Sequence, residues 1–298
     1  MKKEWFTACL IVLCSAGCTE SMEERTTEIP VPLNFNTELQ KEIADFKRTR
    51  AVSGDLDPTG SDNPETHTDL AYFVFPETGD KALKYRQYKH TDEDFGIIYD
   101  TLAVGTYRIA FLAHSSPKLT FTQSGQAYFN KISDSFYTMK TITVATGKES
   151  RHDVTLDRIV GRIEFKATDE VPANMKQFDM EIINYTTGIN VLTGKGIVSS
   201  EAYKLSYLFP EEDKGKDNTS FSFYTFIPGT AQTTGVTIKA VNNDESVNRA
   251  HTIEVTPIAN KTIRYTGKLY TFSEANDRFE IAVNSQWEAP EENILSDN

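Results

Sequence analysis

Side chains that could catalyse a reaction or hold a metal are scattered along this chain of 298 residues. The five histidines include no pair at metal-site spacing, and no H-E-x-x-H sequence occurs. The segment DLDPTGSDNPET, from Asp55, begins like a calcium loop but has Thr66 where that loop needs a bidentate glutamate. No G-x-S-x-G, phosphate-binding or dinucleotide-binding sequence is present. The sequence therefore predicts no enzyme, no metal and no cofactor.

Cysteine is the one reactive residue type whose position indicates a modification. Two lysines precede an apolar run at residues 5–13, which is shorter than the about 20 apolar residues that a membrane-spanning helix needs. Small residues then lead to Gly17 and Cys18. This pattern predicts a signal peptide cleaved between Gly17 and Cys18, with lipid attached to Cys18. An ordinary secretory signal is the alternative, because Ser15 stands where lipoproteins usually have leucine.

Lipidation would place the protein on a membrane and leave it without disulfides. Cys9 and Cys14 fall within the signal peptide, so the mature chain keeps one cysteine, and packing must stabilise it. Two or three acyl chains, at about 0.8 kcal/mol per buried methylene, give stable attachment. Acidic residues that follow Cys18 resemble the surface-export signal of Bacteroidota lipoproteins; a solvated tether is the simpler interpretation. We expect a surface-exposed lipoprotein of the cell outer membrane.

Overall composition excludes one class of partner and favours strands. The formal net charge of -12 argues against nucleic acid, because few basic groups are left to neutralise phosphates. The chain contains 18 Phe and 13 Tyr, residue types that are enriched in β-strands. The composition therefore favours a strand-rich protein that does not bind nucleic acid.

Short apolar or alternating runs, separated by turn residues, continue from residue 70 nearly to the C-terminus. This pattern predicts an all-β fold of two tandem antiparallel β-sandwiches, with short helices in loops. A polar excursion at 115–135 interrupts the first block, and RIVGRIEFKAT opens the second at Arg158. We expect four segments: a signal peptide at 1–17, a lipidated tether with a first strand and possible propeptide at 18–50, an N-terminal sandwich at 51–157, and a C-terminal sandwich with an acidic tail at 158–298.

The segment before the first sandwich has two parts. Residues 29–36, IPVPLNFN, are typical of a lone strand, and Pro30 and Pro32 restrict it to the edge of a sheet. Residues 37–50 place apolar side chains at helical spacing and end in a basic cluster. The sequence therefore predicts an edge strand followed by a short helix.

These features together resemble a known superfamily. The sequence resembles the fimbrial subunits of Bacteroidales type V pili, which comprise fimbrillins and fimbrial-anchor lipoproteins. The resemblance rests on the cysteine followed by acidic residues, the strand before a basic segment, LDRIVGRIEF at 156–165 and FIPGT at 226–230. The resemblance implies transthyretin-like sandwiches and a structural subunit that supports adhesion. It also implies that the partners are other fimbrial subunits, in a homo- or hetero-polymer, and ligands on host or bacterial surfaces.

Strand donation in that superfamily maps onto particular residues of this chain. An arginine-specific protease removes the first strand of stalk subunits, which implies cleavage after Arg48 or Arg50. A donor strand at 279–295 would then use Trp287 and Ile294 as anchors. A solvated basic patch at the arginines and a core position for Trp287 are the simpler alternatives. An anchor subunit would instead keep its lipid and its first strand.

A surface glycan-binding lipoprotein is the alternative function, because such proteins also place tandem β-sandwiches behind a lipidated cysteine. Exposed aromatic rings such as Tyr128 or Trp287 would then form a platform for sugar rings.

Overall fold

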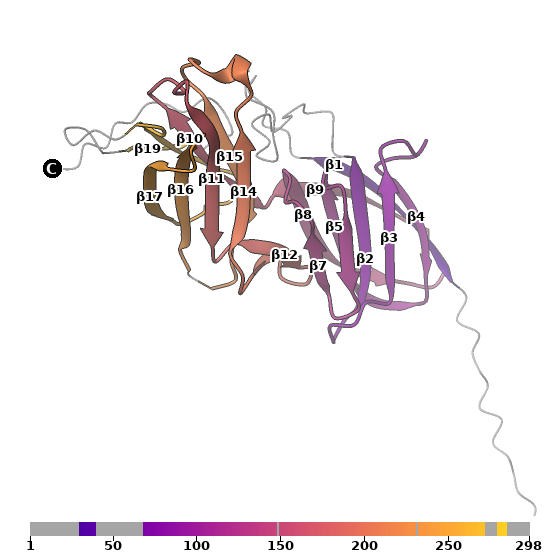
Figure 1. Cartoon of the computed structure of the whole chain (residues 1–298). Helices are drawn as coiled ribbons and strands as arrows, with labels where there is room; N and C mark the ends of the chain where they lie inside the picture. The colour runs from indigo at the N-terminus through magenta and orange to yellow at the C-terminus, as the bar shows by residue number, and fades with distance from the viewer. Residues whose placement is uncertain (1–29, 40–67, 148, 231, 272–278, 285–298) are drawn as a thin grey trace, which may run out of the picture.

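The structure, a computed structural model, describes residues 30–39, 68–147, 149–230, 232–271 and 279–284 (Figure 1). These residues form 19 strands and one short 3₁₀ helix, η1 (Glu211–Asp213). The predicted all-β fold is therefore confirmed. In the part of the chain that the structure describes, no helix is long and apolar enough to cross a membrane.

Seven strands from the first half of the chain form one sheet, in the order β3-β2-β5-β8-β9-β1-β4. Their bounds are β1 (Val31–Leu39), β2 (Asp69–Pro76), β3 (Lys84–Lys89), β4 (Ile97–Leu102), β5 (Gly105–His114), β8 (Ser135–Val144) and β9 (Ser150–Arg158). The two edge strands, β3 and β4, nevertheless lie beside each other (Figure 1). The sheet therefore curls around an apolar interior.

The apolar run of β2 is continuous because both faces of this strand are buried. Successive side chains of a strand point to opposite faces. Tyr72 and Val74 point into the curled sheet, whereas Phe73 and Phe75 belong to a second cluster on its other side. β5 is buried on both faces in the same way.

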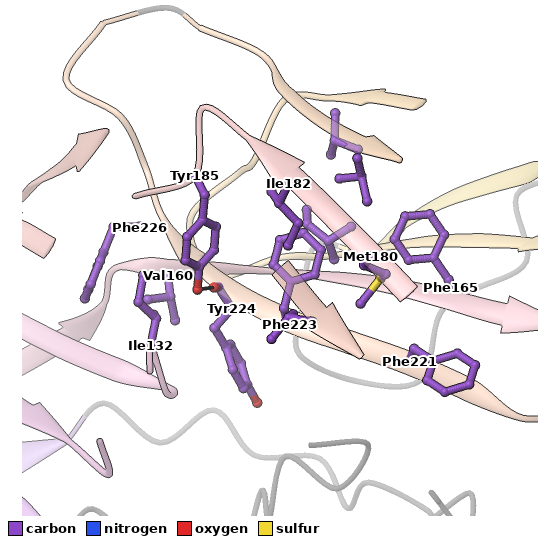
Figure 2. Packing of buried hydrophobic residues seen from close by; sticks show 14 of the residues in the cluster. Ile132, Val160, Phe165, Met180, Ile182, Tyr185, Phe221, Phe223, Tyr224 and Phe226 are labelled. Atoms are coloured by element: carbon purple, nitrogen blue, oxygen red, sulfur yellow. Dashed lines mark hydrogen bonds between the residues drawn. The ribbon is translucent and has the colours of Figure 1, made fainter. Parts of the chain in front are cut away.

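The second half of the chain forms two four-stranded sheets, β15-β10-β18-β19 and β14-β11-β16-β17. Their bounds are β10 (Val160–Ala167), β11 (Met175–Ile183), β14 (Tyr203–Leu208), β15 (Ser220–Phe226), β16 (Thr234–Asn242), β17 (Val247–Val255), β18 (Thr262–Gly267) and β19 (Glu280–Asn284). Phe178 and Phe221 stack in the core with ring centroids 4.3 Å apart. Figure 2 shows the hydroxyl of Tyr185, which donates a hydrogen bond of 3.0 Å to the backbone oxygen of Tyr224.

A fourth sheet joins the two halves. It has the order β13-β12-β7-β6 and consists of β6 (Leu119–Thr122), β7 (Gln126–Phe129), β12 (Thr186–Asn190) and β13 (Lys195–Val198). The predicted polar excursion at 115–135 is therefore wrong in part, because it contains β6 and β7. Ile132, from the same segment, lies in one apolar cluster with Val160 and Phe226 (Figure 2). The halves share both a sheet and a core.

Candidate functional site

β1 lies inside the seven-stranded sheet, with a paired strand on each side. Residues 33–39 pair in parallel with residues 150–156 of β9. Residues 31–36 pair antiparallel with residues 97–102 of β4. The predicted edge position of this strand is therefore wrong.

The two prolines explain why the edge prediction failed. Pro30 precedes β1, and Pro32 is paired with Thr101 of β4. Pairing with β9 starts only at Leu33, so Pro32 has a strand neighbour on one side alone. Because proline lacks an N–H group, it is tolerated where one side of a strand is open.

The helix predicted over 37–50 is wrong at its start. Residues 37–39 belong to β1 and pair with residues 154–156 of β9. Main-chain pairing to a distant strand overrides a local apolar spacing that suits a helix. Residues 40–50 lie outside the described residues.

Alternate side chains of β1 enter the core. Val31, Leu33 and Phe35 are 5%, 2% and 0% exposed. The Phe35 ring lies 5.3 Å from that of Phe111 and stacks on His152 of β9 at 5.4 Å. Without β1, the fold would have an apolar slot with unpaired backbone groups along both of its walls; we call this the β1 slot.

Among the described strands, β4 pairs with β1 alone, so side chains must supply its other links. Asp100 points inward from β4, with its side chain 1% exposed. Its carboxylate accepts hydrogen bonds from Lys84 Nζ at 2.7 Å and from the Tyr72 hydroxyl at 3.0 Å. Arg86 lies 3.6 Å from the same carboxylate. We call these four residues the Asp100 cluster.

Tyr72 and His152 have shifted pKa values that bear on this region. Burial, and secondarily the neighbouring Asp100 carboxylate, raises the pKa of Tyr72, so its phenol stays protonated and donates. Burial, and secondarily the charge of Lys140, lowers the pKa of His152, so its ring is neutral at pH 7. A neutral ring stacked on Phe35 suits the apolar slot.

The structure leaves most of the predicted site residues untested. Gly17, Cys18, Arg48, Arg50, Trp287 and Ile294 all lie outside the described residues. Tyr128 lies on β7 and is half-buried, and its hydroxyl donates to Gln126. Among the described residues, no group of His, Cys, Asp or Glu could hold a metal.

The predicted donor segment is partly described. Residues 280–284 form β19, which pairs antiparallel with β18 of the same chain. Phe279, just before it, packs against the core, with Arg249 above its ring. The described part of this segment therefore belongs to its own sandwich.

Sequence reasoning missed the Asp100 cluster. The alternation in IIYDTL placed Asp100 on the face of Ile98 and Leu102, which are both buried. A carboxylate at an inward position needs partners, so the signal was present. Its cations lie on β3, however, and only the curled sheet brings β3 to β4.

The fold and the β1 slot define a class, all-β proteins of two sandwiches with an inserted N-terminal strand. The chain itself belongs to the family of unknown function DUF6562, whose profile matches residues 116–297. No curated protein sequence matches it.

Solved structures with the same fold include three from Bacteroidales. A candidate adhesin from Bacteroides ovatus has a TM-score of 0.51 at 10% identity and covers 88% of this chain and 93% of its own. A candidate polysaccharide-binding protein from Bacteroides thetaiotaomicron has a TM-score of 0.50 at 14% identity, and the match covers 86% of this chain and 96% of that protein. The fimbrial anchor protein Mfa2 from Porphyromonas gingivalis has a TM-score of 0.50 at 11% identity, and the match covers 86% of this chain and 98% of that protein. The predicted resemblance to type V fimbrial proteins is thus confirmed in the fold, and none of these relatives is described as an enzyme.

Proposed function

We propose that this protein is a subunit of a surface fimbrium that is exported as a lipoprotein through Cys18 and assembles by strand donation. The observation that carries the proposal is the interior position of β1. Removal of β1 would leave unpaired backbone groups on β4 and β9 and an exposed apolar surface between them. A strand from another chain could pair with both strands and cover this surface. The fold shared with a fimbrial anchor and a candidate adhesin supports an adhesive role at the cell surface.

Proteolysis is the step that would make β1 exchangeable. β1 pairs with both β4 and β9, and the chain continues from it into the same sheet. A cut after Arg48 or Arg50 would fall between β1 and β2 and would leave β1 attached by non-covalent contacts alone. A donor strand from a neighbouring subunit could then replace it, with Trp287 and Ile294 as its anchors.

Treatment of the purified mature protein with an arginine-specific protease tests this proposal. We expect loss of the segment that ends at Arg48 or Arg50, together with SDS-resistant ladders of oligomers. The matched control is the double variant Arg48→Lys and Arg50→Lys, which should keep β1 joined to the rest of the chain and stay monomeric, since a cut at Arg25 removes only residues that precede β1. A wild-type chain that loses the segment and stays monomeric contradicts the polymerising role.

The N-terminus of the assembled protein distinguishes the kinds of subunit. Thr49 or Ala51 at the N-terminus in isolated fibres indicates a stalk or tip subunit. An acylated Cys18 retained in fibres indicates an anchor. Cys18→Ser should release an anchor subunit from outer-membrane fractions, since the lipid supplies its attachment.

Glycan binding is the second candidate function. One solved structure of the same fold is described as a candidate polysaccharide-binding protein. On this chain, Tyr85 is 36% exposed and its ring stacks on Phe73, which places a partly exposed aromatic residue on β3. Saturable binding of the uncut monomer to a polysaccharide, lost in Tyr85→Ala, would favour this function over polymerisation.

A further inference from the structure

We propose that the Asp100 cluster keeps β4 in place when β1 leaves, so that the β1 slot stays open for the incoming strand. This inference rests on the proposed function, because it assumes that β1 is exchanged. It assigns a positioning role to Asp100, Lys84 and Arg86, which lie on strands that do not pair with each other.

The first step of the argument concerns what holds β4. Within the described strands its backbone pairs with β1 alone, and it lies at the edge of the sheet. If β1 is removed, no main-chain pairing fastens this strand. Ile98 and Leu102 still reach the core, but apolar contacts are non-directional and leave the backbone of this strand unpaired.

The second step concerns the contacts that do not involve β1. Lys84 Nζ donates a hydrogen bond of 2.7 Å to the Asp100 carboxylate and one of 2.6 Å to the backbone oxygen of Thr101. Arg86 Nη1 donates a hydrogen bond of 3.4 Å to the backbone oxygen of Tyr99. Three successive residues of β4 are therefore bound by β3, and these directional contacts survive the loss of β1.

The third step concerns burial. The side chain of Asp100 is 1% exposed, whereas that of Lys84 is 32% exposed. A buried carboxylate is strongly disfavoured unless it keeps its partners. Movement of β4 away from β3 would expose the Tyr72 phenol and separate the carboxylate from its cations, so the cluster opposes that movement. In the register of β1, Asp100 lies opposite Leu33, at the middle of the slot.

The test measures the position of β4 and the uptake of a strand separately. Spin labels are attached to Leu83→Cys and Tyr99→Cys, two exposed sites on either side of the β3–β4 contact, in a Cys18→Ser chain produced without residues 1–17, so that Cys9 and Cys14 are absent. The chain is cut with the arginine-specific protease, and the released peptide is washed out in urea below the unfolding midpoint. We expect a narrow distance distribution in this cut chain and a broad one in the same chain with Asp100→Asn.

Uptake is measured with a fluorescent peptide of residues 29–39. We expect Asp100→Asn and Lys84→Met to bind it about tenfold more weakly than the cut wild type, the change expected for the loss of one charge-assisted hydrogen bond. Asp134→Asn is the matched control, because it removes a carboxylate just before β8 that pairs with Arg158 of β9, away from β4. Lys84→Met, at a partly exposed site, keeps the test valid if Asp100→Asn does not fold.

The outcomes separate the two proposals. A narrow distribution without any peptide uptake by the wild type contradicts strand exchange but supports the role of the Asp100 cluster. A broad distribution in the cut wild type, or equal uptake by Asp100→Asn and the wild type, overturns the role of the cluster and leaves strand exchange standing.

Discussion

Phe35 is the largest of the buried side chains that β1 places in the core. It is fully buried, and its ring contacts Phe111 and His152. We expect Phe35→Ala to lower the free energy of unfolding by about 3–5 kcal/mol, because it leaves a cavity in a packed core. Urea unfolding measures this change. Pro32→Ala, at an exposed position of the same strand, should change stability by less than about 1 kcal/mol; equal losses would contradict the described packing of β1.

His152 should make stability depend on pH. Burial and Lys140 lower its pKa in the folded chain, so the unfolded chain binds the proton more readily. Its contribution is fully present above pH 6.5, the ordinary pKa, and is lost as pH falls through the lower folded-state value. We expect the urea midpoint to drop from pH 7.5 to pH 5, with a smaller drop in His152→Gln. An identical drop in that variant would show that other groups cause it.

At the scale of elements, the joining sheet depends on a close approach of two strands. A Cβ added to Gly188 of β12 would lie 2.4 Å from the backbone oxygen of Ala127 on β7. We expect Gly188→Val to lower the free energy of unfolding by about 2–3 kcal/mol and to separate β12 from β7. Hydrogen exchange of residues 126–129 would report the separation. At Gly229 the nearest atom would be 3.6 Å away, so Gly229→Ala should leave that exchange unchanged.

At the scale of the whole molecule, one apolar cluster extends from β2 through the joining sheet into the second half. Because both halves bury side chains in it, neither half can unfold without exposing the core of the other. We expect a single unfolding transition, with calorimetric and van't Hoff enthalpies that agree. Two separate transitions would show that the halves are independent, and Gly188→Val is the variant in which we expect them to separate.

Much of the strand content followed from the sequence, because alternation and turn residues are local signals. The apolar run that begins at residue 70 lies in β2, and the segment at 279–295, which was predicted to be a strand, includes β19. Which strands are neighbours in a sheet could not be predicted in this way, because strand pairing is decided by residues far apart in the chain. The alternation of Val31, Leu33 and Phe35 fits an edge strand and an interior strand equally well.

The sequence by itself determined the all-β class, a strand within residues 29–36 and the pattern at Cys18 that predicts lipidation, since each depends on residues close together. Only the tertiary structure decided that β1 lies between β9 and β4. It alone brought Lys84 to Asp100, because the curled sheet places its two edges side by side. A signal peptide is recognised as a linear segment, whereas a slot for a strand exists only where distant strands form its walls.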